Sequence, residues 1–475
     1  MVGDSRRAGD AGAGRVKRVL RAGLLALAGL GLAGMGLAGM GVPAWSQTAA
    51  PDLTARPDPV TGLPVIHTEH GPNSEAARKA HYVVLVSLDG FRWDYAKKYR
   101  AGHLLALGEE GVWAPEGMVP SYPSLTFPNH YAIATGLYPE HNGLVANAFL
   151  DEKRVVEGRL GRYAISDAKA VTDGGFYNGV PLWSLAEKQG MRSACLFWPG
   201  SEAEIAGERP SEYLHFDDKG VDEEKRIDQV EAWLKRPEAE RPHFITLYYS
   251  DVDHAGHSYG PDAQETRDAV ARVDGMVGKL KARLDGLKDG ALKMPVDLIV
   301  VSDHGMVKID GPWINLDAYA DLGNFETAGP LLYGKTEADR AAAYEKLKKA
   351  SDKFEAYRLK DVPAGLHYNE NSREGDPVIV PTGPYAIRAH APPVGKPDSG
   401  PVGQHGFDPR AMPEMKASFF AEGPDIVQGK TVAPFENVNL YPWIAHILGL
   451  TPAKSDGSLN VLAGTLRDGG NSKKE

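Results

Sequence analysis

Acidic and histidine side chains follow several apolar runs of this sequence, each near the point where a run ends. Asp89 follows the first strong apolar run, and the pair Asp303-His304 follows a run of valine, leucine and isoleucine. Asp253 comes shortly after a third run, and His257 lies four residues further on. Carboxylate and imidazole groups are the ligands that zinc and similar divalent cations take in proteins. If the fold brings these side chains together, their chemistry predicts a metal site.

The apolar runs have the pattern of buried strands in a parallel sheet. Residues 82–88 read Tyr-Val-Val-Leu-Val-Ser-Leu, without the alternation of a strand that faces water on one side. Strands that alternate with amphipathic helices predict an α/β fold with a mostly parallel central sheet flanked by helices. Open sheets of this kind build their sites at the carboxyl ends of strands. The further runs are 194–198, 244–249, 297–301 and 417–421, and the helical patterns are 222–235, 262–287 and 336–354.

The number of candidate ligands distinguishes a metal pair from a single ion. One aspartate after a strand is usually a turn former, and His405, in a Gly-Gln-His-Gly-Phe segment, would alone be a loop histidine. One cation needs three or four ligands, whereas Asp89, Asp253, His257, Asp303, His304 and His405 supply six. Two cations a few ångströms apart hold the attacking and leaving oxygens of an in-line displacement at phosphorus. The set therefore predicts phosphoryl-transfer chemistry.

A nucleophile is available in Thr126, which is followed by Phe127-Pro128. Residues 129–135 can continue a helix, and a hydroxyl near a helix N-terminus lies in positive potential. Coordination to zinc would lower the pKa of the hydroxyl and make the alkoxide accessible. The competing interpretation is that Thr126 only caps the helix. Sequence logic alone leaves both open.

Composition places the chain among globular exported proteins. Of its 475 residues 42% are hydrophobic, and the net charge of -10 disfavours a role as a nucleic-acid scaffold. Residues 1–46 combine a basic stretch, an apolar run and an Ala-Trp-Ser sequence with the spacing of a cleavage site, which predicts a signal peptide. If uncleaved, the same run could anchor the chain in a membrane. The signal leads us to expect a periplasmic or secreted protein. The single cysteine, Cys195, cannot form an internal disulfide, which suits a bacterial periplasm better than an animal extracellular space.

The remaining sequence divides into a linker, one catalytic domain and a tail. The Pro-rich, polar segment 47–79 is expected to be a linker. Residues 80–455 are expected to form the catalytic domain, with an irregular, Pro- and Gly-rich cap subdomain inserted at about 310–400. Residues 456–475 are expected to be a C-terminal tail.

Seven ordered motifs resemble those of the nucleotide pyrophosphatase/phosphodiesterase family, in the alkaline phosphatase superfamily. They run from about residue 82 to residue 451, and a chain with so few cysteines resembles a bacterial form without the cysteine-rich modules of animal members. The resemblance implies an alkaline-phosphatase-like fold. The motifs begin at Leu85, Pro123, Thr135, Phe197, Val252, Ser302 and Gln404, and include Leu-Val-Ser-Leu-Asp-Gly-Phe-Arg, Pro-Ser-Leu-Thr-Phe-Pro-Asn-His-Tyr and Ser-Asp-His-Gly-Met.

The family resemblance implies a role for each matching position. One zinc would lie among Asp89, Thr126, Asp303 and His304, and the other among Asp253, His257 and His405. Thr126 would carry a covalent intermediate that water then releases. Asn147 would donate a hydrogen bond to a non-bridging phosphate oxygen, as an oxyanion hole does.

The resemblance also implies a nucleotide site. Phe127 would stack on a nucleobase, and the opposing aromatic would be Tyr213 or Phe216, between which the sequence does not decide. The expected substrate is a small nucleotide-type diester or pyrophosphate that yields a nucleoside 5′-monophosphate, and no stable protein partner is implied. Two other activities stay open, those of a phospholipid-headgroup phosphodiesterase and of a phosphate monoesterase. Against the latter, residues 198–204 contain no Lys or Arg to bind a dianion.

Overall fold

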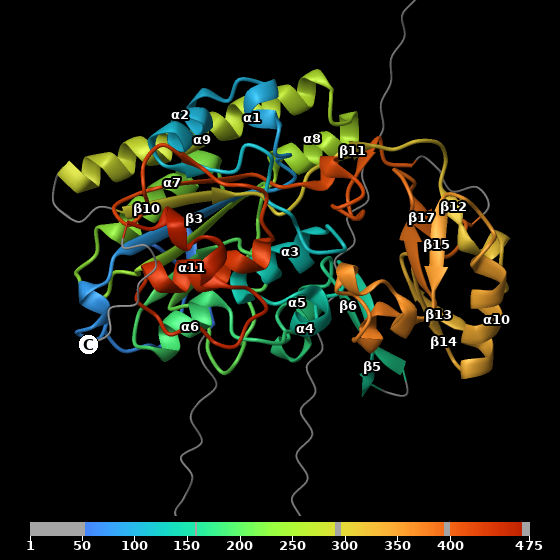
Figure 1. The fold of residues 1–475 in the computed structure, drawn as a ribbon. Coiled ribbons are helices and arrows are strands. Elements are labelled where there is room, and N and C mark those ends of the chain that lie inside the picture. Colours follow the sequence, from blue (N-terminus) through green and yellow to red (C-terminus); the bar gives the residue numbers. More distant parts are fainter. Residues whose placement is uncertain (1–52, 157–158, 290–295, 394–399, 468–475) are drawn as a thin grey trace, which may run out of the picture. The chain divides into compact units, whose positions relative to one another are not determined.

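The computed structural model describes residues 53–156, 159–289, 296–393 and 400–467 (Figure 1). The expected signal peptide, residues 1–46, lies outside the described residues. Among the helices of the described ranges, none combines the length and the apolar character needed to cross a bilayer.

A ten-stranded mixed sheet forms the centre of the described chain, with the strand order β1-β2-β8-β7-β9-β3-β10-β19-β4-β20. The five strands from β8 to β10 are parallel, and antiparallel pairs flank them on both sides. The α/β prediction with a mostly parallel central sheet is thus confirmed. The strands are β1 (Arg56–Pro57), β2 (Pro64–His67), β8 (Glu212–Leu214), β7 (Ser193–Leu196), β9 (Phe244–Tyr249), β3 (Tyr82–Leu88), β10 (Val296–Val301), β19 (Phe419–Glu422), β4 (Val112–Trp113) and β20 (Lys430–Thr431).

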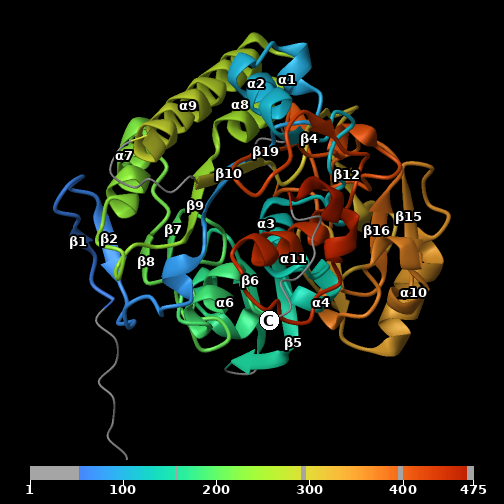
Figure 2. The same cartoon turned by 60° about the vertical axis from the view of Figure 1, so that its left-hand side comes forward.

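Helices cover both faces of the sheet, which is why its strands are continuously apolar. Alternate residues of β3 enter two different cores, because successive side chains of a strand point to opposite faces. Val84 and Val86 pack with one group of helices, and Val83 and Leu85 face the other (Figures 1 and 2). The first group is α2 (Gly102–Glu110), α7 (Glu223–Leu234) and α9 (Gln264–Asp289), and the second is α3 (Thr126–Thr135), α6 (Leu182–Lys188) and α11 (Leu440–Ile447). The shorter helices are α1 (Tyr95–Lys98), α4 (Pro139–Asn142) and α5 (Ala168–Val171).

The segment between β11 (Val307–Lys308) and β18 (Gly403–Gln404) has a hydrophobic cluster of its own, which runs from Ile314 to Ala389. β11 and β18 pair with each other and thereby close the base of this inserted segment. The cluster lies within residues 310–400, where the sequence predicted an insertion. Its elements are β12 (Ile314–Asn315), β13 (Phe325–Ala328), β14 (Leu331–Gly334), α10 (Glu337–Leu347), β15 (Phe354–Tyr357), β16 (Val378–Pro381) and β17 (Ile387–Arg388).

Buried polar contacts fasten the inserted segment to the hairpin of β5 (Ala148–Val156) and β6 (Arg159–Ala164). The Arg373 guanidinium donates to Asp151 Oδ2 over 3.0 Å from Nε and 2.7 Å from Nη2. Tyr333 Oη accepts from the Leu150 N–H at 3.1 Å and donates to the Arg373 carbonyl at 2.6 Å. Figure 1 shows the inserted segment in orange beside this hairpin. Charge-assisted bonds between buried groups hold the two parts in one arrangement.

The expected linker, residues 47–79, is in part a piece of the sheet. β2 pairs with β8, and β1 pairs with β2. Val65 and Ile66 are completely buried, and Leu63 is nearly so. Because prolines and polar residues surround this short apolar segment, the sequence pattern did not indicate a strand there. The burial of the segment stabilises the edge of the sheet.

Part of the expected C-terminal tail, residues 456–475, also belongs to the packed domain. Leu462 and Leu466 are buried in the main core, and Trp443 Nε1 donates to Thr465 Oγ1 over 3.0 Å. The packed domain therefore continues at least to Leu466, because Leu462 and Leu466 are buried in the same core as the residues of α11.

Glu374, next to the anchoring Arg373, is a titratable group with a predictable effect on stability. It is fully buried, and burial together with the nearby Glu140 raises its pKa to about 9. An acid whose pKa is raised by folding makes the protein less stable as pH rises from its unfolded value to its folded value. We expect Glu374→Gln to raise Tm by about 2 °C or more at pH 8 and by less at pH 5. Differential scanning calorimetry checks this, with Glu326→Gln, an exposed glutamate of the inserted segment, as control, and an equal change at both pH values would contradict it.

Candidate active site

The ends of β3 and β10 bring the first group of candidate ligands together. In the parallel register Ser87 lies opposite Val301, so Asp89 and Asp303 leave the same sheet edge. Asp303 Oδ1 accepts from the Gly90 N–H at 3.2 Å. His304 Nε2 lies 3.4 Å from Asp89 Oδ1 and 3.0 Å from Asp303 Oδ2. All three side chains are buried.

β9 delivers the second group through α8 (Asp251–Tyr259). Asp253 and His257 are four residues apart and therefore lie on one face of this helix, with His257 Nε2 3.3 Å from Asp253 Oδ1. Gly90 permits the close approach of α8: its φ is +67°, and a Cβ there would lie 2.9 Å from the Asp253 Cα. Glycine, which has no Cβ, can adopt this positive φ and also leave room for the backbone of Asp253.

His405 reaches the site from a distant part of the sequence. The β11–β18 ladder pairs Gln404 with Val307, which places His405 beside the segment that carries His304. The two imidazole rings stack with centroids 3.5 Å apart. His405 Nε2 is 3.2 Å from His257 Nε2 and 3.5 Å from Asp253 Oδ1. The six predicted Asp and His ligands thus form one contiguous cluster.

Two overlapping sets of ligand atoms within this cluster could each hold a metal ion. One set is Asp89, Asp303 and His304, and the other is Asp253, His304 and His405, with the ligand atoms of each set within 4.8 Å of one another. His304 belongs to both sets. His257 contacts the second set through Asp253 and His405.

The unsatisfied oxygens of this cluster fit divalent cations. Asp89 Oδ1, Asp253 Oδ1 and Asp303 Oδ2 are buried without a hydrogen-bond donor from the protein. Burial and the charges of Asp303 and Asp253 raise the pKa of Asp89 well above its usual value. Three carboxylates in so small a buried volume repel one another. Positive ions bound among them would satisfy the orphaned oxygens and offset this repulsion.

Thr126 is the first residue of α3, and its hydroxyl faces the cluster. Leu125 is the N-cap residue, with extended backbone and no side-chain cap. Thr126 Oγ1 lies 3.3 Å from His304 Nε2. The alternative that Thr126 is merely the N-cap therefore does not describe the structure. Its position at the start of a ten-residue helix adds the positive potential of the helix terminus.

Two residues that the ligand argument passed over support this arrangement. Tyr248 Oη donates to Asp89 Oδ2 over 2.5 Å, and the sequence presents it only as part of an apolar strand. His130 is buried, and its Nε2 lies 2.8 Å from Ser87 Oγ. Its Nδ1 is 2.8 Å from the Thr126 carbonyl, so His130 ties the start of α3 to the end of β3. The sequence feature that could have identified Tyr248 is its aromatic hydroxyl, near the end of a strand and five residues before Asp253.

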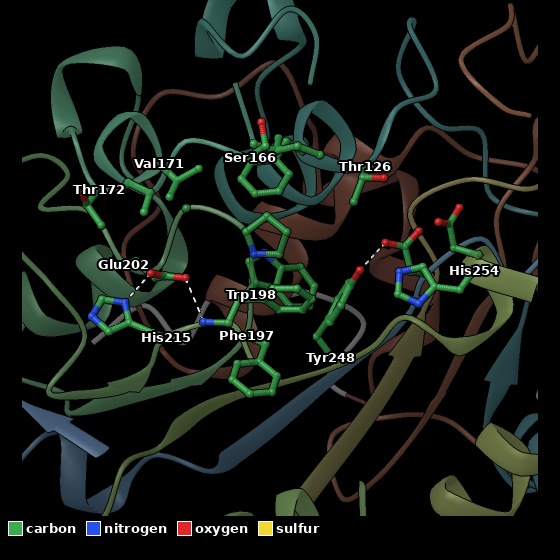
Figure 3. Close-up of a pocket in the computed structure, with 18 residues that line it drawn as sticks. Thr126, Ser166, Val171, Thr172, Phe197, Trp198, Glu202, His215, Tyr248 and His254 are labelled. Carbon is green, nitrogen blue, oxygen red and sulfur yellow. Dashed lines mark hydrogen bonds and ion pairs between the residues drawn. The ribbon is translucent and has the colours of Figure 1, made fainter. Parts of the chain in front are cut away.

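A cavity of about 520 Å³ opens beside Thr126. Phe127, Trp198 and Phe216 line it together with Tyr248. Figure 3 shows Thr126 and His254 at one side of the cavity and Glu202 and His215 at the other, with Trp198 between them. Glu202 forms an ion pair with His215 and accepts from the Phe216 N–H at 3.1 Å. His254 lines the cavity but belongs to neither ligand set.

The structure separates the two aromatic candidates for base stacking. Phe216 lies two residues beyond the end of β8, lines the cavity and is 51% exposed. Tyr213 lies within β8, opposite Cys195 and Ile66, and is 1% exposed. Tyr213 does not line the cavity, so of the two only Phe216 is placed to meet a ligand there.

Asn147 lies just before β5, and its side chain contacts the start of α3. Its Oδ1 accepts from the Phe127 N–H at 3.0 Å, which leaves the amide nitrogen as the free donor end. Asn147 and His405 both line a second cavity, of about 360 Å³. The predicted donor is therefore fixed between the nucleophile's helix and that cavity.

Comparisons with known proteins point to one family. The family model of type I phosphodiesterase / nucleotide pyrophosphatase matches residues 83–408. An uncharacterized pyrophosphatase/phosphodiesterase of Schizosaccharomyces pombe is 35% identical over 413 residues, covering 83% of this chain and 82% of the relative. Human ectonucleotide pyrophosphatase/phosphodiesterase family member 1 is 35% identical over 411 residues, which are 82% of this chain and 43% of the longer human protein.

A solved structure extends the likeness to three dimensions. Murine ectonucleotide pyrophosphatase/phosphodiesterase 5, in an inactive threonine-to-alanine form in complex with AMP, matches with a TM-score of 0.73 and 28% identity. The match covers 81% of this chain and all of the murine chain. The fold, the motifs and the sequence matches thus agree. The chain belongs to the nucleotide pyrophosphatase/phosphodiesterase family of the alkaline phosphatase superfamily and is an enzyme of that family.

Proposed function

We propose that this enzyme is a two-zinc phosphodiesterase that releases nucleoside 5′-monophosphates through a covalent intermediate on Thr126. One observation carries the proposal: the Thr126 hydroxyl lies between the Asp and His cluster, in which three carboxylates each have one oxygen without a hydrogen-bond donor, and an aromatic-lined cavity. In the reaction, Thr126 Oγ1 forms a bond to phosphorus and the bond to the leaving oxygen breaks. Water then cleaves the threonine ester and restores the hydroxyl.

The donor set supports zinc. Mixed carboxylate and imidazole ligation suits zinc better than magnesium or calcium, which prefer oxygen ligands alone. Asp89, Thr126, Asp303 and His304 would hold one ion, and Asp253, His257 and His405 the other. Bound zinc would supply a Lewis acid that lowers the hydroxyl pKa and offsets charge on the phosphoryl oxygens.

The protein itself orients the reacting groups. The His130 contacts fix the backbone of Thr126, and Tyr248 fixes the carboxylate of Asp89. Asn147 is held by the Phe127 N–H so that its amide can donate to a phosphoryl oxygen. Positioning of this kind supplies a large part of the rate in phosphoryl transfer.

The cavity beside Thr126 supports a nucleotide as the retained half of the substrate. A volume of about 520 Å³ lies within the usual range for small-molecule sites. Phe127 and the exposed Phe216 offer aromatic faces, on which any nucleobase can stack. The murine neighbour, in its inactive form, holds AMP.

The charge of this cavity favours a diester over a monoester. Its described lining residues include Asp89, Glu202 and Asp253 but neither Lys nor Arg. A monoester dianion would need cationic side chains beyond the metals, whereas a diester carries one negative charge less.

We expect the purified enzyme to hydrolyse bis-p-nitrophenyl phosphate with a kcat/KM at least about tenfold above that for p-nitrophenyl phosphate. A tenfold ratio corresponds to about 1.4 kcal/mol of transition-state binding, which the monoester loses because the described lining of the cavity has no Lys or Arg to bind its second negative charge. Thymidine 5′-(p-nitrophenyl phosphate) should be a better substrate than either, since it also fills the aromatic cavity. Nitrophenolate release measures all three rates. Hydrolysis of glycerophosphocholine is followed separately by chromatography of its products. A preference for the monoester, or for glycerophosphocholine over the thymidine ester, would overturn the proposal.

A further inference from the structure

The second cavity of about 360 Å³ lies between the catalytic core and the inserted segment. Tyr122 and Asn147 line it from the core, and Trp313, Leu331 and Tyr385 line it from the insertion. It shares no lining residue with the cavity beside Thr126. Each of the two nevertheless reaches the ligand cluster, the first through Asp89 and Asp253 and the second through His405.

The proposed reaction requires room for a leaving group as well as for the nucleotide. In an in-line displacement the leaving oxygen departs on the side opposite the nucleophile. With the nucleoside in the cavity beside Thr126, the leaving group needs a separate place next to the cluster. His405, a member of the cluster, lines the second cavity, and so does Asn147, the proposed donor to the phosphoryl group.

The walls of the second cavity select a particular chemistry. Five aromatic residues are among its described lining residues: Tyr122, Trp313, Tyr368, Tyr385 and Phe407. No carboxylate occurs among its described lining residues, and Arg388 is a cation there. The Arg388 guanidinium lies over the Trp313 ring at 5.0 Å and donates to Asn315 Oδ1 over 2.6 Å, which fixes both side chains. Such a surface suits a flat apolar group.

The cavity is held open by contacts that do not involve any ligand. Tyr368 Oη donates to the Val145 carbonyl over 3.0 Å, and the Tyr368 ring packs edge-on against Tyr122. The buried Arg373–Asp151 pair fastens the same part of the insertion to β5. A preformed cavity binds its ligand without the cost of ordering its walls.

We propose that this second cavity is a leaving-group subsite that favours a flat aromatic leaving group. The inference rests on the proposed function, because it takes Thr126 as the nucleophile and the first cavity as the nucleotide site. On this proposal, the residues of the inserted segment set the relative rates of diesters that share one nucleotide half and differ in the leaving group.

The test compares two substrates with the same thymidine 5′-phosphoryl half. One is thymidine 5′-(p-nitrophenyl phosphate), with an aromatic leaving group, and the other is thymidine triphosphate, with pyrophosphate. We expect Trp313→Ala to lower kcat/KM for the nitrophenyl ester about tenfold, the scale of one aromatic stacking contact. The loss for the triphosphate should be several-fold smaller, which also shows that the variant is folded. Trp313→Phe, which keeps a flat ring, should restore most of the preference.

Tyr319→Ala is the matched control, since Tyr319 is a 40% exposed aromatic of the same inserted segment that does not line the cavity. It should leave the rates on both substrates unchanged. Equal losses for both substrates in Trp313→Ala, or no loss for either, would overturn the leaving-group subsite while the proposed function stands. A wild-type enzyme that hydrolyses neither substrate would instead remove the proposed function and this inference with it.

Discussion

Thr126→Ala is expected to lower kcat on thymidine 5′-(p-nitrophenyl phosphate) by about 10⁴-fold or more, the scale seen when a covalent nucleophile is removed. The reason is geometric: Thr126 Oγ1 is the hydroxyl that lies 3.3 Å from His304 Nε2 at the start of α3. Alanine keeps the helix start, because Leu125 supplies the N-cap position. Steady-state release of nitrophenolate measures the loss.

The metal content of Thr126→Ala distinguishes loss of the nucleophile from loss of the metal site. Six Asp and His ligands remain in Thr126→Ala, so the variant should still bind close to two zinc ions by elemental analysis of the dialysed protein. Thr126→Ser keeps a hydroxyl at the same point and should retain measurable turnover. Rapid acid quenching of the wild type should leave nucleotide on the peptide that contains Thr126, detected by mass spectrometry. Turnover above about 1% of wild type in Thr126→Ala would show that another group attacks phosphorus.

Much of this site could be predicted because it is built on strand ends. A buried strand is recognised by its continuous apolar run, and the residue after it lies at a known edge of the sheet. Asp89 and Asp303 follow from that rule alone, and the structure places them within contact of one another through His304. His257 follows from helical spacing once Asp253 is placed on a helix.

The remaining residues depend on pairings between distant parts of the chain. His405 enters the cluster because β18 pairs with β11 across about a hundred intervening residues, and a two-residue ladder leaves little pattern in a sequence. Tyr213 and Phe216 are both aromatic, and the choice between them depends on where β8 ends, at Leu214. Strand ends are uncertain by a few residues in any prediction from sequence, and that uncertainty spans both side chains.

The same limit explains the errors at the two ends of the catalytic domain. Val65 and Ile66 belong to a strand of four residues, β2, which prolines and polar residues surround and which is too short to be recognised within a linker. Leu462 and Leu466 share a core with α11 and lie in a segment whose helical elements are two 3-10 turns of three residues each. In both places tertiary burial, which the local sequence does not show, decides the structure.

Removing the metal ions is expected to abolish activity and to lower Tm by an amount that grows as pH rises from 5 to 8. Each ion held at a concentration 1,000-fold above its Kd contributes about 4 kcal/mol to the free energy of unfolding. In the metal-free protein, burial and the charges of Asp303 and Asp253 hold the pKa of Asp89 above its unfolded value. The folded apo-protein then keeps a proton on Asp89 that the unfolded chain has lost, so the contribution of Asp89 to stability falls as pH rises above its unfolded pKa of about 4. Bound cations favour the ionised carboxylates and oppose that fall.

The measurement is a pair of thermal melts at each pH, before and after chelation, followed by readdition of zinc, magnesium or calcium. Zinc should restore activity and Tm together. His257→Ala should lower the zinc content, because His257 contacts both Asp253 and His405. His254→Ala, three residues away on the same helix and 63% exposed in its side chain, is the matched control and should keep two ions. A Tm difference that does not change with pH would mean that the buried carboxylates are neutralised by some means other than bound metal.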